Sequence, residues 1–300
     1  MVEIDKFGCS IFAKNFWNLR PIFLFKLLII NLLFVSENLR AAHVDTLEIF
    51  SAAMQKNIKC LAVIPDNYRA TGEAYPVLYL LHGWSGNFAG WLSEAPQLRQ
   101  HADNFQMIIV CPDGGYDSWY LDSPVDSSVR YDTYISKEVV GFIDYYYNTR
   151  KNRSGRAIAG LSMGGHGAIT LAIKHVEIFG AAGSMAGGLE LRTFKKNDWR
   201  LHKVLGNPET HWDNWENSSA VSLVPRLKNR RDLALIIDCG LGDFFLETNR
   251  EMHRKLLEIN YPHEYTERPG EHNGEYWSSA VDYQVLFFDK FFGKNKQERL

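Results

Sequence analysis

Short apolar runs and stretches of helical spacing alternate along most of the chain. A continuous apolar run is typical of a strand buried on both faces of a sheet, and apolar residues three or four positions apart indicate a helix. The predicted strands are Tyr75–Leu81, Met107–Cys111, Ala157–Leu161, Phe179–Ser184, Asp232–Asp238 and His263–Glu267. The predicted helices are about Glu94–Ala102, Tyr131–Tyr147, a segment from Ala168, Leu246–Ile259 and Tyr276–Phe292. This alternation predicts an α/β fold with a mostly parallel central sheet and helices on both faces.

Two segments near the start of this region follow a different pattern. Val44–Ala52 and Asn57–Ile64 alternate apolar and polar residues, which predicts two antiparallel strands at a sheet edge. Residues 186–231 are less regular and contain several tryptophans and charges, which suggests a helical insertion above the sheet. No repeat, low-complexity segment or linker divides the chain, so residues 43–300 are predicted to form a single domain.

The N-terminal residues 1–42 resemble a secretory signal with a long leading region. Residues 21–35 are an apolar run followed shortly by Ala41 and Ala42, as expected of a signal peptide. The run is shorter than the roughly 20 residues that span a bilayer. Lys26 inside the run fits a signal poorly, so an uncleaved anchor and a cytosolic extension remain alternatives. We expect a secreted or periplasmic protein, with the cytoplasm as the alternative, and no stable membrane insertion of the mature domain.

The composition is that of an ordinary globular protein. Of 300 residues, 46% are hydrophobic and 23% charged, and the net charge is −2. Such a balance gives no basic field for nucleic acid. We see no histidine or cysteine spacing typical of a metal site, and we expect no metal and no cofactor. Four cysteines are scattered singly, and buried thiols are a simpler interpretation than disulfides. They are Cys9, Cys60, Cys111 and Cys239.

The stretch around Ser162 carries the clearest chemical signal. The run Ala157–Leu161 leads into Gly160-Leu161-Ser162-Met163-Gly164, and a helical pattern follows at once. A tight strand-to-helix turn needs glycine at its flanks, where a Cβ would collide, and leaves the serine hydroxyl exposed at its tip. The following helix points backbone N–H groups at an oxyanion formed there. We interpret Ser162 as a nucleophile; an ordinary glycine-rich turn is the alternative.

A serine nucleophile needs a base, and the base needs an orienting carboxylate. His272 lies in a glycine-containing loop after the last predicted strand, which makes it the best candidate for the base. Two carboxylates near the end of the preceding strand compete for the third position. Asp243 lies past two glycines, in the loop proper, and is preferred over Asp238, which is still at the strand end.

An oxyanion hole needs two backbone donors. One is expected to be the N–H of Met163, which follows the serine, and the other the N–H of Trp84, in the loop after the strand ending at Leu81. Simple packing is the alternative for Trp84. His82 in the same loop is expected to order the loop rather than to react.

Aromatic side chains stand near the predicted site and could bind substrate. Trp119 and Tyr120 follow the strand ending at Cys111, and Tyr276 and Trp277 come shortly after His272. Flat faces suit sugar rings or a phenolic acyl group. The alternative is that half of these aromatic residues belong to the core.

The ordered motifs resemble the esterase D family of α/β-hydrolases, which includes S-formylglutathione hydrolases, tributyrin esterases, and the feruloyl and acetylxylan esterases of carbohydrate esterase family 1. The motifs are Tyr79-Leu80-Leu81-His82-Gly83, Gly86, Trp91, Cys111-Pro112-Asp113-Gly114, Trp119-Tyr120, Asp122-Ser123-Pro124, Gly160 to Gly167, Gly242-Asp243, Gly270-Glu271-His272 and Tyr276-Trp277. The resemblance covers about residues 44–293. It implies an α/β-hydrolase fold, the triad Ser162, Asp243 and His272, and the donors Met163 and Trp84.

These patterns together predict a serine carboxylesterase that works through an acyl-enzyme. The resemblance and the leader favour acetyl, feruloyl or other short acyl esters of plant polysaccharides, so the expected partner is a small-molecule or carbohydrate ester. An S-formylglutathione hydrolase-like thioesterase and an acyltransferase on the same triad remain alternatives. A non-catalytic carbohydrate-binding descendant is disfavoured because all three triad positions are filled. A homo-oligomer is compatible with the sequence.

Overall fold

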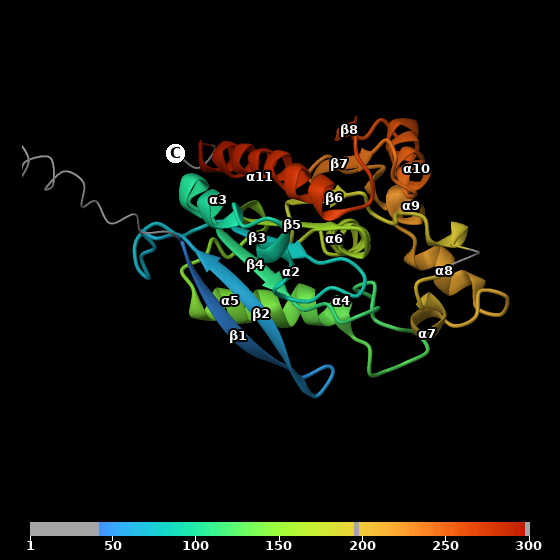
Figure 1. Ribbon diagram of the computed structural model, residues 1–300, viewed down its shortest axis with the longest axis horizontal. Coiled ribbons are helices and arrows are strands. Elements are labelled where there is room, and N and C mark those ends of the chain that lie inside the picture. Colours follow the sequence, from blue (N-terminus) through green and yellow to red (C-terminus); the bar gives the residue numbers. More distant parts are fainter. Residues whose placement is uncertain (1–41, 195–197, 298–300) are drawn as a thin grey trace, which may run out of the picture. The chain divides into compact units, whose positions relative to one another are not determined.

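An eight-stranded sheet organises residues 42–194 and 198–297, which the computed structural model describes (Figure 1). The strands are β1 (His43–Ser51), β2 (Lys56–Ile64), β3 (Val77–Leu81), β4 (Ile108–Pro112), β5 (Arg156–Leu161), β6 (Ala181–Met185), β7 (Ala234–Gly240) and β8 (Glu264–Arg268). Their order is β1-β2-β4-β3-β5-β6-β7-β8, with β1 and β2 antiparallel and all pairs from β4 to β8 parallel. The predicted fold class and the antiparallel edge pair are confirmed.

Helices cover both faces of this sheet (Figure 1). The α-helices are α2 (Gly90–Glu94), α3 (Leu98–Phe105), α4 (Tyr131–Thr133), α5 (Val140–Tyr146), α6 (Met163–Lys174), α7 (Leu201–Leu205), α8 (Trp212–Ser218), α9 (Ala220–Leu223), α10 (Leu246–Glu258) and α11 (Gly274–Gln297). Shorter turns are the π-helix η1 (Tyr134–Val139) and the 3₁₀ helices η2 (Arg153–Gly155), η3 (Leu191–Thr193) and η4 (Val224–Leu227).

The apolar side chains divide into one hydrophobic core on each face. Val77 and Tyr79 of β3 join the core under α5, α6 and α10, whereas Leu78 and Leu80 join the core under α2, α3 and α11. All four side chains are fully buried. This is the alternation expected of a central strand that is covered on both sides.

The helix predicted at Glu94–Ala102 is wrong in detail. The structure has two helices there, α2 and α3, because the chain leaves the helical path at Ala95. Pro96 explains the break, since a proline ring clashes with the carbonyl four residues earlier and lacks an N–H. The break leaves the short helix α2, with Trp91 and Glu94, as a separate element.

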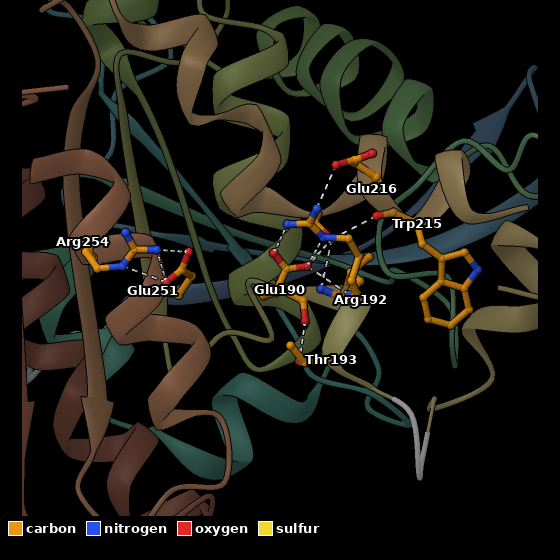
Figure 2. Close-up of polar contacts among 9 residues, drawn as sticks. Glu190, Arg192, Thr193, Trp215, Glu216, Glu251 and Arg254 are labelled. Carbon is orange, nitrogen blue, oxygen red and sulfur yellow. Dashed lines mark hydrogen bonds and ion pairs between the residues drawn. The ribbon is translucent and has the colours of Figure 1, made fainter. Parts of the chain in front are cut away.

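An ion-pair cluster anchors the helical insertion that follows β6 (Figure 2). Arg192 of η3 donates from Nε and Nη2 to the buried Glu190 at 2.8 and 2.6 Å, and Ser219 Oγ donates to the same carboxylate at 3.0 Å. Burial would raise the pKa of Glu190, but the hydrogen bonds from Arg192 hold it below its usual value. The first turn of the insertion is thereby tied to the start of α9.

Several predictions concern residues outside the described part of the chain. Residues 1–41 of the proposed leader, which was predicted to span residues 1–42, lie there, as does Cys9. The three described cysteines, Cys60, Cys111 and Cys239, are free and buried, as predicted. Within residues 42–194 and 198–297, no helix is long and apolar enough to cross a bilayer.

Candidate active site

Ser162 occupies a strained turn between β5 and α6. Its backbone φ is +54° and its ψ −116°, a combination that costs energy for any residue with a Cβ. A Cβ added to Gly160 would collide with the backbone of Gly164, and one added to Gly164 would collide with the carbonyl of Leu81. The two glycines therefore let α6 start directly against β3 and β5, and the serine lies at the tip.

Ser162, His272 and Asp243 form a continuous hydrogen-bonded chain. Ser162 Oγ lies 2.9 Å from His272 Nε2, and His272 Nδ1 lies 2.8 Å from Asp243 Oδ2. Since a carboxylate only accepts, Nδ1 carries the ring proton and Nε2 is free to accept from the serine hydroxyl. The other oxygen of Asp243 accepts from the Phe245 N–H at 2.7 Å, and its side chain is fully buried. The three side chains come from the loops after β5, β8 and β7.

Asp238, the rival carboxylate, belongs to a different network. It lies within β7 and is 1% exposed. It accepts from Tyr276 Oη at 2.8 Å, Arg268 Nη2 at 3.1 Å and Gln284 Nε2 at 2.7 Å. Burial raises its pKa to about 6. Of the two candidates, the structure brings Asp243 to His272.

The loop after β3 lies beside the serine and is ordered by His82. Gly114 N–H donates to His82 Nε2 at 2.8 Å, so the proton resides on Nδ1, which donates to the Gly83 carbonyl at 2.8 Å. Burial lowers the pKa of His82, which keeps the ring neutral in this arrangement. An added Cβ on Gly83 would lie 3.5 Å from the Cβ of Ser162. Trp84, the next residue, is therefore placed near the serine.

A cleft of about 180 Å³ opens at Ser162 and His272. Its lining is rich in aromatic rings and includes one carboxyl group. The lining residues are His82, Gly83, Trp84, Gly86, Gly90, Trp91, Glu94, Leu161, Ser162, Trp199, Phe244, His272 and Trp277. Phe244 and Trp277 flank the imidazole, with ring centroids 4.2 and 4.9 Å from it. Trp277 thus reaches the cleft as predicted from sequence.

Trp199 and Phe244 were not predicted. The two rings stack with an interplanar angle of 14° and a centroid separation of 5.9 Å. Phe244 directly follows Asp243, so its proximity to the site could have been inferred from the loop. Trp199 comes from the insertion. Its backbone carbonyl accepts a hydrogen bond from Trp84 Nε1 at 3.0 Å. No local pattern in the sequence signals that contact.

The prediction that Trp119 and Tyr120 line the cleft is wrong. The two side chains are 1% and 0% exposed, and neither is among the described residues that line the cleft. Both residues have left-handed backbone conformations, with φ of +52° and +57°, and their rings lie in the core. Tyr120 Oη instead donates to the His82 carbonyl at 3.0 Å, and its ring packs against Gly114 and Gly167. It supports the loop that carries Trp84.

Tyr276, also considered for the cleft, is 5% exposed and is bonded to Asp238. Among the described residues, no three histidine, cysteine, aspartate or glutamate side chains gather in a way that could hold a metal ion.

A mostly parallel sheet with a serine at a strained strand-to-helix turn defines the α/β-hydrolase class. The chain belongs to the esterase family: residues 51–288 match the family described as "Putative esterase".

Individual relatives agree with this assignment. Esterase Rv1288 of Mycobacterium tuberculosis is 30% identical over 245 residues, which are 70% of this chain and 51% of that protein. The chain therefore spans about half the length of that relative. A ferulic acid esterase structure, 27% identical, superposes with a TM-score of 0.71 over 83% of this chain and 98% of its own. An S-formylglutathione hydrolase from Agrobacterium tumefaciens shares the fold, with 22% identity, a TM-score of 0.70, and coverage of 84% and 96%.

Proposed function

We propose that the protein is a serine carboxylesterase with Ser162 as nucleophile, His272 as general base and acid, and Asp243 as the orienting carboxylate. The observation that carries this proposal is the hydrogen-bonded chain from Asp243 through His272 to Ser162, at the floor of an open cleft. A base within hydrogen-bond reach of the nucleophile, itself held by a carboxylate, is the arrangement that activates a serine hydroxyl.

The reaction proceeds in two halves. Ser162 Oγ attacks the ester carbonyl carbon while its proton passes to His272 Nε2. The carbonyl oxygen becomes an oxyanion, which the N–H groups of Met163 and Trp84 stabilise. His272 then gives the proton to the leaving alcohol oxygen as the C–O bond breaks. Water repeats the sequence on the acyl-enzyme: His272 takes its proton, the hydroxyl adds to the acyl carbon, and Ser162 leaves with that proton as the free acid forms.

Aromatic walls support an acetyl, feruloyl or other short acyl ester of a plant polysaccharide as substrate. Trp84, Trp199, Phe244 and Trp277 line a cleft of about 180 Å³. Each ring stacked on a sugar or a phenolic acyl group would contribute on the order of 1 kcal/mol. The similarity to a ferulic acid esterase is consistent with this substrate class.

Two other activities use the same chemistry. A thioesterase acting on S-formylglutathione would have to bring the carboxylates of glutathione to a cleft that already contains Glu94. Like charges repel, most strongly where water is excluded, so we favour neutral esters. An acyltransferase would differ only in replacing water by an alcohol or sugar acceptor.

The proposal is tested with wild type and Ser162→Ala on p-nitrophenyl acetate, methyl ferulate, acetylated xylan and S-formylglutathione. We expect hydrolysis of the first three, a lower kcat/KM for S-formylglutathione, and a loss of about 10³-fold or more in the folded variant. Activity of Ser162→Ala within about tenfold of wild type would reject Ser162 as nucleophile. Acyl transfer to added xylo-oligosaccharide in excess of hydrolysis would favour the acyltransferase.

We further propose that residues 1–42 direct the enzyme out of the cytoplasm, because their apolar run resembles a signal peptide. N-terminal mass spectrometry of the protein recovered from its host tests this. A full-length chain in the cytoplasmic fraction would contradict export.

A further inference from the structure

Asp238 is a buried carboxyl group to which the proposed mechanism assigns no role. It lies within β7 and is 1% exposed. A buried ionisable group is costly, and an apolar side chain of similar volume generally serves a core as well or better. All of its side-chain bonds described above come from β8 and α11, the two elements that precede and follow the His272 loop.

Two of these partners bracket His272. Arg268 is the last residue of β8, and Tyr276 lies in the first turn of α11. Both donate to the same oxygen, Asp238 Oδ1, at 3.1 and 2.8 Å. The loop that presents His272 therefore begins and ends at side chains fixed by one carboxyl oxygen.

The same loop is joined to the loop of Asp243 by backbone bonds. Leu241 N–H donates to the Arg268 carbonyl and Gly242 N–H to the Gly270 carbonyl, both at 2.8 Å. Asp238 lies in β7 and Asp243 in the loop that follows it. These backbone bonds and the Asp238 side chain therefore hold the His272 loop and the Asp243 loop as one rigid frame. The distance from His272 Nδ1 to Asp243 Oδ2 depends on that frame.

We propose that Asp238 is a positioning residue for His272, acting through Tyr276 and Arg268. This rests on the proposed function, in which His272 Nε2 must reach the proton of Ser162. Asp238 does not touch the reacting atoms. It fixes the two ends of the His272 loop so that the imidazole stays in line between Asp243 and Ser162. Misplacement of a reacting group by about 1 Å can lower a rate up to about 10²-fold.

The test compares Tyr276→Phe with Tyr283→Phe. Arg268 lies over both rings, with its guanidinium carbon 5.5 Å from the centroid of Tyr276 and 4.3 Å from that of Tyr283. Only the Tyr276 hydroxyl is bonded to Asp238, whereas Tyr283 is 53% exposed. The pair therefore separates loss of the Asp238 bond from loss of a tyrosine hydroxyl beside Arg268.

For Tyr276→Phe we expect kcat on p-nitrophenyl acetate to fall about tenfold, with KM within about twofold of wild type. Labelling of Ser162 by a neutral fluorophosphonate should slow by the same factor, since it needs the same proton transfer. Tyr283→Phe should match wild type in both assays. If Tyr276→Phe does not fold, Arg268→Gln, at a partly exposed position, should show the same loss.

A role limited to core stability predicts a lower unfolding midpoint with unchanged kcat per folded molecule, and that result overturns the proposal. So does a loss confined to KM, or an equal loss in Tyr283→Phe. Failure of the proposed function is distinguishable, because wild type would then not be labelled or Ser162→Ala would remain active.

Discussion

Ser162 has a strained backbone conformation that its neighbouring residues maintain. The left-handed φ of +54° is kept by a helix that starts at once and by glycines on either side. Strain of this kind costs about 1–3 kcal/mol and persists only where packing over-determines it. The resulting turn holds the Ser162 hydroxyl 2.9 Å from His272 Nε2.

Asp243→Asn tests the orienting role of the buried carboxylate. An amide nitrogen facing His272 Nδ1 would favour the tautomer with its proton on Nε2, which cannot accept from Ser162. We expect kcat on p-nitrophenyl acetate to fall about 10³-fold or more. Asp238→Asn keeps an acceptor oxygen for Tyr276, so its loss should be at most about tenfold. The reverse order would assign the orienting role to Asp238, and equal losses would contradict a distinct role for Asp243.

The residues that sequence reasoning selected are those whose position follows from chain order. Ser162, Asp243 and His272 each lie in a glycine-containing loop after a strand, and parallel strands bring such loops to one sheet edge. Trp119 and Tyr120 also follow a strand, but periodicity does not reveal that left-handed turns direct their rings into the core. Trp199 reaches the cleft through tertiary contacts of the insertion, which leave no local signal.

Among the elements, strands were predicted more accurately than helices. Buried strands such as β5 are recognisable because every residue after Arg156 is apolar or small, and the whole strand is buried. The region around α2 was predicted as one helix because its apolar spacing continues past Pro96, whose ring ends the helix for steric reasons. Irregular segments such as η3 to η4 are held by specific ion pairs, and these cannot be read from periodicity.

Arg192→Met tests the ion-pair cluster that anchors the insertion. The change leaves the Glu190 side chain, 7% exposed, without its bidentate partner. Removing one partner of a buried pair costs about 3–5 kcal/mol; because Arg192 is 28% exposed, we expect about 2 kcal/mol in the free energy of unfolding. Urea unfolding at 25 °C measures it.

Arg254→Met is the matched control for that experiment. Arg254 pairs with Glu251 on the exposed face of α10, and Figure 2 shows both pairs together. Exposed pairs contribute little, so its unfolding midpoint should match wild type. A similar shift in both variants would mean that the Glu190 pair does not anchor the insertion.

At the scale of the whole molecule, the buried neutral histidine His166 should contribute a loss of stability on mild acidification. Burial lowers the pKa of His166 to about 4, against about 6.5 in the unfolded chain. Between these values the unfolded state binds more protons, so stability present above pH 6.5 is lost as the pH falls toward 4. The contribution of His166 alone is roughly 3 kcal/mol. Asp238 acts in the opposite direction, because its pKa is raised.

His166→Gln isolates this contribution. Relative to its own value at pH 7, the variant should lose roughly 3 kcal/mol less than wild type by pH 4. The Asp238 contribution cancels in that difference. His211→Gln, at an exposed position, should follow the wild-type curve. Parallel curves for wild type and His166→Gln would show that His166 is not held neutral by burial.

The three buried thiols can report local opening of the sheet. Cys60, Cys111 and Cys239 lie on β2, β4 and β7 and are 0% exposed. Burial raises the pKa of all three, that of Cys111 to about 12, and only a thiolate reacts. A thiol reagent therefore cannot modify them until the strand that carries each one separates from its neighbours. In a Cys9→Ser variant, the order in which the three thiols react would show which edge of the sheet opens first.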